Sequence, residues 1–515
     1  MNDLTLQTID VEASPLTPIT SSLSSVVLTA KSGRFEIKDE LRQVLALTAD
    51  GVLHISDNYL SDPYVMAFID RLEHEEFDFQ IQSASMVQIK SLYDTAAQHA
   101  GQGSQAETLR QAQALELIGH AHKAGASDIH IVVGHDITKL FYRVHGLLWE
   151  ARQEKSEVGN ELCSALYNSM CDVSKEHYQA HIPQDARVSR RFVEQLGLFG
   201  ARIATRPLVD GPLMIMRLLY DDASKQTLDE LGFLPEQIEH FARLRSLPYG
   251  VNLFTGPTGS GKSKSLQVNL NLLHDETEGT RHILTLENPP EYRLKANQSA
   301  LGAAETWSEA ITNTVRLDPD VLMYGELRDL ASAQAAYTGG MTGHQVWSTL
   351  HTNDAIAAIP RLIDMGVPHY LVTDPALTTG IINQSLLPVL CPHCKVPLLE
   401  HQSALDKALF NRLAKLHMVD QVYLTGEGCP QCKGMALVDR TVAAEMLLTD
   451  LLFMKVFNEQ GASAARRHWV KEMGGITKIA HARMKIAAGI VDPRHAETMV
   501  GPLDFDQQLV ELSHA

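Results

Sequence analysis

Along the chain, hydrophobic residues recur either at every second position, as in strands, or at the spacing of a helix. The first clear change from one pattern to the other lies near the N-terminal end. In "VLALTADGVLHIS" apolar residues alternate with other residues on both sides of Asp50-Gly51, which predicts two strands joined by a turn. The next stretch, "DPYVMAFIDRLEHE", has helical spacing, and "FDFQIQS" is again typical of a strand. Residues 31–98 are therefore predicted to form a small α/β module.

Two polar segments flank this module. Residues 1–30 are rich in Ser, Thr and Pro, and we expect them to be disordered. The segment "AAQHAGQGSQAE", which follows the module, is predicted to be a linker. Residues 107–245 then form a predicted second α/β domain: a helix over 107–124, strands around "SDIHIVV" and "KLFYRVHG", and paired strands near "LFGARIATRP" and "PLMIMRLL".

The longest regular alternation of elements follows this second domain. Between residues 246 and 386 apolar strands alternate with helices, which predicts a doubly wound α/β sheet. Residues 387–445 contain two pairs of cysteines, and residues 446–515 have helical periodicity.

Length and charge limit the classes of protein. A chain of 515 residues is too long for one compact core. Its net charge of −18 argues against a protein that coats nucleic acid, because phosphate binding depends on cationic side chains. The most apolar stretch, residues 435–457, is interrupted by charged residues, and the first residues lack the pattern of a secretory signal. We therefore expect a cytoplasmic location, with any membrane attachment made through partners.

A glycine-rich loop predicts a phosphate site. The loop "GPTGSGKS" follows the apolar strand "VNLFT" and precedes a helical stretch, and it fits G-x-x-x-x-G-K-[ST]. Backbone N–H groups of such a loop face an anion, the lysine supplies a point charge, and the last hydroxyl serves Mg²⁺. A chance match would lack the strand and the helix. The predicted nucleotide-binding residues of the loop are Gly256, Pro257, Thr258, Gly259, Ser260, Gly261, Lys262 and Ser263, with Ser263 also the magnesium ligand.

Acidic and histidine side chains follow other predicted strands. Glu326 comes after "DVLMY", and Glu287 ends "HILTLE". Either acid alone is more often a solvated loop residue, but two acids at strand ends beside a phosphate loop suit the activation of water. His344 and His351 flank the strand in "TGHQVWSTLHTNDA", where a histidine is either structural or a donor to the γ-phosphate.

These four segments, in this order, resemble the Walker A, Asp, Walker B and His boxes of secretion ATPases, the hexameric motors of type II secretion and type IV pilus assembly. The resemblance covers about residues 107–515 and includes "GASDIHI", "IPQDARV" and "LCPHC". It implies a RecA-like P-loop domain preceded by a PAS-like second domain. It also implies that Glu326 is the catalytic glutamate, that Glu287 helps to hold Mg²⁺, and that His351 and His344 sense the γ-phosphate.

The resemblance further implies that arginines reach the nucleotide from outside the loop. The matching positions are Arg202, Arg217 and Arg316. The alternative is a solvated basic face, or a nucleic-acid patch formed together with Arg187, Arg190 and Arg191. Three positions depart from the family pattern: Asn288 replaces an aspartate, Thr312 replaces an arginine, and His145 replaces an aspartate.

The cysteine pairs predict a structural metal. Two C-x-x-C sequences separated by 34 residues suit a tetrahedral Zn²⁺ site, with a redox dithiol or four separate core cysteines as alternatives. The predicted ligands are Cys391, Cys394, Cys429 and Cys432, and His393 is a spare. Cys163 and Cys171 lie in a helical stretch and are predicted to fill the core.

The resemblance implies a homohexamer that couples ATP hydrolysis to fibre assembly, with ATP, Mg²⁺ and a structural Zn²⁺ as its cofactors. The resemblance implies two partners, an inner-membrane platform protein and the cytoplasmic domain of the assembly complex, so the motor would be peripheral to the membrane. The N-terminal module looks more like type IVb pilus motors, including those of conjugative plasmids, than like the type II secretion motor. A type II pseudopilus motor, a nucleic-acid translocase or conjugation motor, and a binding module with a degenerate site remain alternatives.

Overall fold

The structure is a computed structural model that describes residues 27–30, 35, 37–38, 41–56, 59–60, 62–75, 77–173, 177–220, 227–302 and 305–507. Residues 1–26, most of the segment predicted to be disordered, lie outside this range. Residues 27–30 belong to the N-terminal module, because Val27 is buried there and forms a β-bridge with Thr48.

The N-terminal module contains a three-stranded sheet and a helix, as its hydrophobic pattern predicts. The strands are β1 (Leu45–Leu47), β2 (Val52–Ile55) and β3 (Gln80–Ser83), and they lie in the order β1-β2-β3. Helix α1 (Pro63–His74) begins where the Asp62 carboxylate accepts hydrogen bonds from two backbone N–H groups. Its buried face, with Val65 and Leu72, packs on Leu53 in the core of the module.

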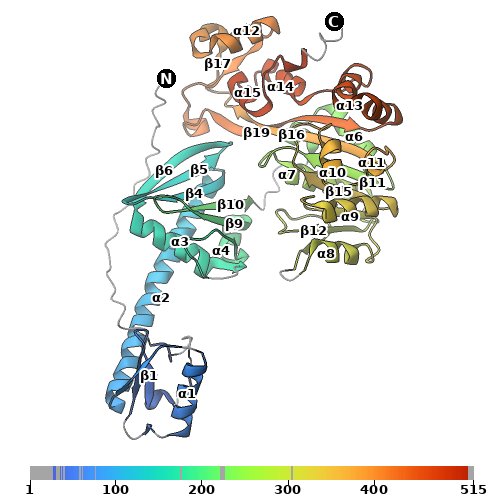
Figure 1. The fold of residues 1–515 in the computed structure, drawn as a ribbon. Helices are drawn as coiled ribbons and strands as arrows, with labels where there is room; N and C mark the ends of the chain where they lie inside the picture. The colour runs from blue at the N-terminus through green and yellow to red at the C-terminus, as the bar shows by residue number, and fades with distance from the viewer. Residues whose placement is uncertain are drawn as a thin grey trace.

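Helix α2 (Met86–Lys123) joins the module to the second domain (Figure 1). It runs straight through the segment predicted to be a linker, so the linker prediction and the predicted helix start at residue 107 are both wrong. The helix begins at a capping box formed by Ser85 and Gln88. The segment is rich in Ala and Gln and has no Pro, and its two glycines cost only about 1 kcal/mol each in a helix.

The second domain is a seven-stranded antiparallel sheet with helices on one face. The strand order is β6-β5-β4-β10-β9-β8-β7. Apolar residues at every second position of β4 and β10 pack against α2 and α3 (Ser156–Met170), while the opposite face carries the polar side chains of these strands, with apolar residues such as Ile215 and Val132 among them. The strands are β4 (Ala126–Val133), β5 (Ile137–Val144), β6 (Leu147–Lys155), β7 (Cys171–Val173), β8 (Gln184–Val188), β9 (Leu198–Pro207) and β10 (Pro212–Tyr220). The predicted pairing of the last two strands is confirmed.

The third sheet is the predicted doubly wound sheet. Its order is β13-β12-β14-β15-β11-β16-β19, and its strands are parallel except for the antiparallel β19. The strands are β11 (Gly250–Thr255), β12 (Ile283–Glu287), β13 (Asn297–Ala300), β14 (Val321–Tyr324), β15 (Gln345–Leu350), β16 (Thr378–Leu390) and β19 (Leu437–Leu448). The central strands are buried on both faces, which explains their continuous apolar runs.

Helices cover both faces of this sheet. One face packs on α8 (Trp307–Thr314), α9 (Leu330–Met341), α10 (Ala358–Asp364), α11 (His369–Val372) and α13 (Leu451–Lys471). The other packs on α5 (Leu228–Leu231), α6 (Pro235–Ser246) and α7 (Lys262–Glu276). The two faces make two separate hydrophobic clusters, and the carboxyl ends of the parallel strands are left at one edge.

The cysteine insertion leaves the third sheet between β16 and β19. It contains β17 (Val396–Pro397), β18 (Tyr423–Leu424) and α12 (Lys407–Lys415), and it packs against α14 (Lys478–Ala487) and α15 (Pro493–Val500) near the top of Figure 1. The helices after β19 confirm the helical periodicity of the tail. Among the described residues, no helix is both long and apolar enough to cross a bilayer.

Candidate functional site

The phosphate loop connects β11 to α7 and is shaped by glycine. Gly256 and Gly261 have φ angles of 139° and 84°, which other residues rarely adopt. A Cβ atom on Gly256 would lie 2.3 Å from the carbonyl oxygen of Gln384, so no side chain fits there. The loop therefore ends directly at the N-terminus of α7, where unpaired backbone N–H groups and the helix dipole attract an anion.

Lys262 occupies the centre of the loop. Its Nζ donates hydrogen bonds to the carbonyl oxygens of Gly256, at 2.9 Å, and Pro257, at 3.0 Å. Burial lowers the pKa of Lys262 from 10.5 to about 8, although the charge of Glu326 acts in the opposite direction. A cation that has lost most of its water in this way is stabilised by an incoming phosphate.

Glu326 and His351 meet beside Lys262. Glu326 follows β14 and His351 follows β15, which are neighbouring parallel strands. His351 Nε2 lies 3.0 Å from Glu326 Oε1, and His351 Nδ1 lies 3.1 Å from the Gly256 carbonyl oxygen and 3.5 Å from Lys262 Nζ. Arg328 donates from Nε to the other oxygen of Glu326 at 2.7 Å. The structure thus brings a lysine, an imidazole and a carboxylate together at one edge of the sheet.

Glu287 ends β12 at the same edge, next to β14. Its Oε1 accepts hydrogen bonds from Thr285 Oγ1 at 2.9 Å and from Gln298 Nε2 at 3.0 Å. Burial raises the pKa of Glu287, and these two hydrogen bonds act in the opposite direction. Two strands, β14 and β15, separate Glu287 from β11 and the phosphate loop, and a buried carboxylate at the same edge of the sheet is suited to a cation.

His344 is not brought to this group. Because β15 runs parallel to β11, His344 precedes the strand at the amino edge of the sheet, whereas His351 follows it at the carboxyl edge. His344 Nδ1 lies 3.0 Å from Thr342 Oγ1 and 3.2 Å from the Gly339 carbonyl oxygen, at the end of α9. The contact with the γ-phosphate that the sequence predicted for His344 is therefore not made within one chain.

The arginines of the second domain form a row across the polar face of its sheet. Arg143 lies opposite Asp128 in the register of β5 and β4, and Arg217 lies opposite Asp128 in that of β10 and β4. Arg202 follows opposite Arg217 on β9, and Arg187 lies opposite Arg202 on β8. Directly opposed residues point to the same face, so these five side chains define a line, called here the arginine row.

Asp128 is the only carboxylate in the arginine row. It is buried, accepts a hydrogen bond from Arg217 Nε at 3.0 Å, and lies 4.0 Å from Arg143 Nε. At the outer end Arg187 pairs with Asp172 at 3.3 Å. Like charges opposed on neighbouring strands are destabilising, so a sheet that keeps three consecutive arginines is suited to an anionic ligand. Arg143 and Asp128 were not predicted from the sequence as site residues. Only the pairing register of the strands shows that they belong to the row.

The other arginines that the sequence singled out, Arg316, Arg190 and Arg191, lie outside the arginine row. Arg316 is exposed in the turn between α8 and β14. Arg190 pairs with Glu194 at 2.8 Å, and Arg191 lies over the ring of Phe192. The last two belong to the short helix α4 (Arg190–Val193) and face local partners, which does not favour the nucleic-acid patch.

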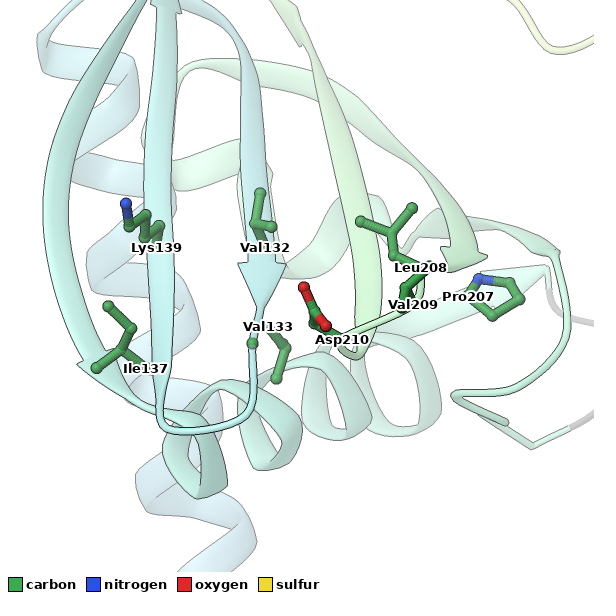
Figure 2. Close-up of a pocket in the computed structure, with 9 residues that line it drawn as sticks. Val132, Val133, Ile137, Lys139, Pro207, Leu208, Val209 and Asp210 are labelled. Carbon is green, nitrogen blue, oxygen red and sulfur yellow. The ribbon is translucent and has the colours of Figure 1, made fainter.

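A concavity lies further along the polar face of the second domain, beyond the arginine row. Figure 2 shows Val132 and Lys139 on neighbouring strands, with Leu208 and Asp210 from the turn between β9 and β10. Its lining is mainly apolar and contains none of the predicted site residues. It does not contribute to the phosphate site.

The four predicted zinc ligands come together in the cysteine insertion. Their sulfur atoms all lie within 4.8 Å of one another, with Cys391–Cys429 and Cys429–Cys432 separations of 3.7 Å and a Cys394–Cys432 separation of 3.8 Å. A tetrahedron with Zn–S bonds of about 2.3 Å has edges of about 3.8 Å, so the cluster fits zinc. The backbone N–H groups of Cys429 and Ala436 donate to the sulfur of Cys432 at 3.1 and 3.2 Å, which favours its thiolate.

The other two cysteines behave as predicted for core residues. Cys163 is buried in the second domain, and Cys171 packs against the same core. Burial raises the pKa of both thiols to about 12, so neither is reactive.

The cysteine insertion also contacts the second domain. Lys433 Nζ donates a hydrogen bond to the carbonyl oxygen of Lys123 at 3.0 Å, and Met435 packs against the core of the second domain. His145, one of the departures from the family pattern, lies in the turn between β5 and β6, close to Asp439 and Arg440 at the start of β19. Burial lowers the pKa of His145. This position therefore belongs to a contact between two domains.

Comparisons with known proteins show the family and the fold of the chain. Residues 105–500 match the sequence profile described as Type II/IV secretion system protein. The type II secretion system ATPase E of Vibrio cholerae is 34% identical over 357 residues, which are 68% of this chain and 68% of that protein. The type IV pilus assembly ATPase PilB of Thermus thermophilus is 32% identical over 352 residues, 67% of this chain and 38% of that protein. The solved structure of the Legionella pneumophila ATPase DotB has the same fold, with a TM-score of 0.50 at 20% identity over 74% of this chain and 93% of DotB.

Proposed function

We propose, from the premise that the chain belongs to the type II/IV secretion system protein family, that it is a hexameric ATPase that drives assembly of a type IV pilus. Family membership makes it a secretion or pilus ATPase. The finer statement, that ATP hydrolysis is converted into pilin polymerisation, is the proposal.

The observation that carries the proposal is the convergence of Lys262, His351 and Glu326 at one edge of the sheet. In this proposal Lys262 and the loop amides bind the β- and γ-phosphates. Glu326 orients and deprotonates the attacking water, and the imidazole of His351 contacts the γ-phosphate. His351 lies within hydrogen-bonding range of both Lys262 and Glu326, and such a group beside a helix N-terminus suits phosphoryl transfer to water.

The residues present also fit Mg²⁺, the usual companion of ATP. The hydroxyl of Ser263 and the carboxylate of Glu287 are oxygen donors at the same edge as Lys262, and oxygen is the ligand atom that Mg²⁺ prefers. We expect Ser263 to bind the ion directly and Glu287 to hold it through water. The ion would neutralise charge on the phosphates. Because Asn288 is neutral, Glu287 is expected to do this without a second carboxylate.

The arginine row supplies the second half of the mechanism. Arg202 and Arg217 stand on a rigid sheet that is separate from the phosphate loop. We propose that they reach the phosphates of a bound nucleotide, in their own or a neighbouring subunit of the hexamer, and that Arg316 does so from a third side. Loss of the γ-phosphate would remove the charge that holds the two domains closed, and the domains would rotate apart.

We further propose that this rotation acts on an inner-membrane platform protein. The N-terminal module, which resembles those of type IVb and plasmid-encoded pilus motors, would bind the cytoplasmic domain of the assembly complex. The motor would thus be peripheral to the membrane. The cysteine cluster favours an assembly or secretion motor over a retraction motor, since the family resemblance implies that the first two usually carry it, and we expect a bound zinc to stabilise the insertion.

The direct test measures ATP turnover by the full chain and by the Glu326→Gln variant. The wild type is expected to release phosphate, and the variant to be about 10²–10⁴-fold slower with unchanged nucleotide affinity, because only the carboxylate that activates water is lost. Glu278→Gln, at an exposed glutamate after α7, is the matched control and is expected to equal the wild type. Equal rates for the wild type and Glu326→Gln would leave only a nucleotide-binding module.

A second candidate function, the type II secretion motor, is favoured by the identity of 34% to the Vibrio cholerae ATPase. Cytoplasmic domains of platform proteins from the two kinds of system separate the candidates, since only the cognate domain should raise turnover. Stimulation by DNA instead would point to a nucleic-acid motor.

A further inference from the structure

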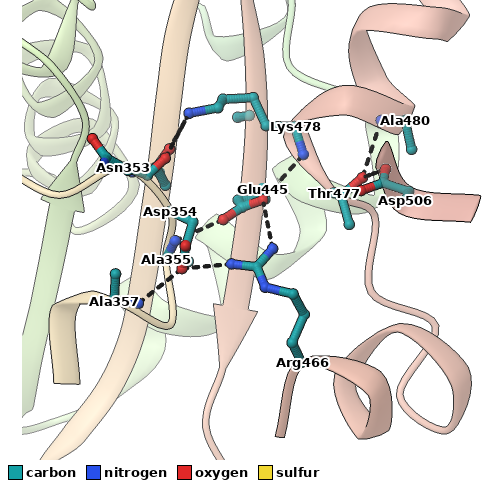
Figure 3. Close-up of polar contacts among 12 residues, drawn as sticks. Asn353, Asp354, Ala355, Ala357, Glu445, Arg466, Thr477, Lys478, Ala480 and Asp506 are labelled. Atoms are coloured by element: carbon teal, nitrogen blue, oxygen red, sulfur yellow. Dashed lines mark hydrogen bonds and ion pairs between the residues drawn. The ribbon is translucent and has the colours of Figure 1, made fainter. Parts of the chain in front are cut away.

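The loop that carries His351 is held by polar groups from four elements, three of which do not contact the phosphate loop through any bond among the described residues. The loop follows β15 and comprises residues 351–357. Figure 3 shows Glu445 of β19, Arg466 of α13 and Lys478 of α14 directed at its middle part. The fourth element is β16, which contributes Asn383.

Each residue from 352 to 355 has its own partner. The Thr352 carbonyl oxygen accepts from Asn383 Nδ2 at 3.0 Å, and the Asn353 carbonyl oxygen accepts from Lys478 Nζ at 2.9 Å. The remaining two contacts use side-chain carboxylates: Asp354 forms an ion pair with Arg466, and the Ala355 N–H donates to Glu445 Oε1 at 2.6 Å.

The partners are also joined to one another and to the phosphate loop. Glu445 Oε2 accepts from the backbone N–H of Lys478 at 3.2 Å and lies 3.8 Å from Arg466. Lys478 Nζ donates to Asn383 Oδ1 at 2.8 Å, and Asn383 Nδ2 donates to Thr255 Oγ1 at 2.9 Å. Thr255 is the last residue of β11, directly before the phosphate loop. One polar network therefore holds both segments that meet at Lys262.

This network is costly to bury. Glu445 is 2% exposed and Lys478 is 8% exposed, and burial raises the pKa of Glu445 and lowers that of Lys478. Hydrophobic residues of similar volume often give a free energy of unfolding as large as that of a buried ion pair. A network of this kind, fully bonded along one loop, is instead suited to fixing a position.

We infer that Glu445, Lys478 and Arg466 are positioning residues for His351, so that the C-terminal helices and β19 set the distance of its imidazole from the γ-phosphate. The inference rests on the proposed function, since it gives His351 a role in hydrolysis. Among the described residues, no hydrogen bond or ion pair joins Glu445, Lys478 or Arg466 directly to the catalytic group at Lys262. Their effect passes through the backbone of residues 352–355.

The test compares Glu445→Gln with Glu497→Gln in the full chain. Glu497 joins α12 and α15 through an ion pair with Arg412, at 2.7 Å, and accepts a backbone N–H, so it is a partly buried glutamate with similar bonds away from the loop. Glu445→Gln is expected to lower kcat by about tenfold with the KM for ATP changed by less than about threefold, as for other groups that orient a functional side chain. Glu497→Gln is expected to match the wild type in both constants.

A double-mutant cycle separates positioning from general damage. In a His351→Ala background the loss caused by Glu445→Gln should disappear, because there is no imidazole left to position. A full tenfold loss in that background, or none in the wild-type background, would overturn the inference. Should Glu445→Gln fail to fold, Arg466→Gln replaces it in the same cycle with the same expectations.

Amide hydrogen exchange gives a readout that needs no turnover. Glu445→Gln should speed exchange in residues 352–357, whereas Glu497→Gln should leave it unchanged. If the wild type did not hydrolyse ATP, the proposed function would fail, and the exchange pattern would still decide whether these residues hold the loop. Equal exchange in both variants would contradict the inference in either case.

Discussion

The phosphate loop and the arginine row are both cationic, yet they hold their charges in opposite ways. Lys262 is buried, its ammonium is surrounded by carbonyl oxygens, and its acid and imidazole partners lie within the same chain. The arginine row lies on a polar sheet face, with Arg217 43% exposed and a single carboxylate, Asp128, between its cations. The loop thus has its chemical groups together within one chain, while the row has four arginines and one carboxylate within it.

This difference suggests separate roles: the phosphate loop binds the nucleotide, and the arginine row couples the nucleotide state to the position of the second domain. A desolvated lysine in a rigid loop contributes affinity, because the free energy lost on burial is regained when a phosphate arrives. In the proposed mechanism, half-exposed arginines of the second domain contribute little until a triphosphate lies between that domain and the phosphate loop. We therefore expect substitutions in the loop to act on nucleotide affinity, and those in the row to act on turnover.

The largest effect is expected for Lys262→Ala. Removal of the buried cation should weaken nucleotide binding by about 2–5 kcal/mol, the cost of leaving a buried charge partner unpaired. Titration of the full chain with a fluorescent ADP analogue measures it. Lys264→Ala, two residues further along α7 at a side chain that lies over the ring of Tyr292, is the control and should change affinity little. A binding curve for Lys262→Ala equal to that of the control would remove the loop from the mechanism.

The next effect is expected for Arg217→Ala. Turnover should fall about 10²-fold while nucleotide affinity changes little, because a donor aimed at developing charge acts mainly on the transition state. Steady-state phosphate release and the same binding titration separate the two quantities. Arg187→Ala, at the outer end of the arginine row, is the matched control and should cost less than about threefold. The opposite pattern, a loss of affinity without a loss of turnover, would make the row a second binding site.

The contrast also explains what the sequence predicts and what it does not. The phosphate loop follows from eight consecutive residues, and Glu326 follows from a strand end, so local pattern suffices. The arginine row depends on the register of antiparallel strands far apart in the chain, and Asp128 gains its meaning only beside Arg217. The spacing of hydrophobic residues within one segment does not predict how distant strands pair.

Two failures have simpler physical causes. The supposed linker is helical because alanine and glutamine outweigh two glycines within α2. His344 was placed with His351 because both flank one strand, yet in a parallel sheet the two ends of a strand lie at opposite edges. Strand direction, which the sequence does imply in an alternating α/β pattern, would have kept His344 away from the phosphate site of its own chain. The match of residues 105–500 confirms the resemblance to secretion ATPases.

A smaller effect is expected from pH. The pKa of Lys262 is about 8 in the free protein, and a bound phosphate favours the charged form and so raises it. Above about pH 8 the free protein loses this proton, and nucleotide affinity should fall by up to about tenfold per pH unit until the pKa of the complex is reached. Binding titrations from pH 7 to pH 10 measure the slope. Lys262→Arg keeps its charge over this range and should flatten it; an equally steep slope in that variant would assign the titration to another group.

The smallest effect is expected for Asp128→Asn, and it tests whether the carboxylate of the arginine row competes with a nucleotide for Arg217. Asparagine still accepts a hydrogen bond but lacks the charge, so the guanidinium becomes more available to phosphate. The KM for ATP should fall by up to about fivefold, which corresponds to about 1 kcal/mol for a partly exposed ion pair, and the difference should shrink at high salt. Asp172→Asn makes the same change beside Arg187 and should leave KM unchanged. A rise of KM in Asp128→Asn would mean that Asp128 holds Arg217 in its working position, so that the row would be preorganised in the way the phosphate loop is.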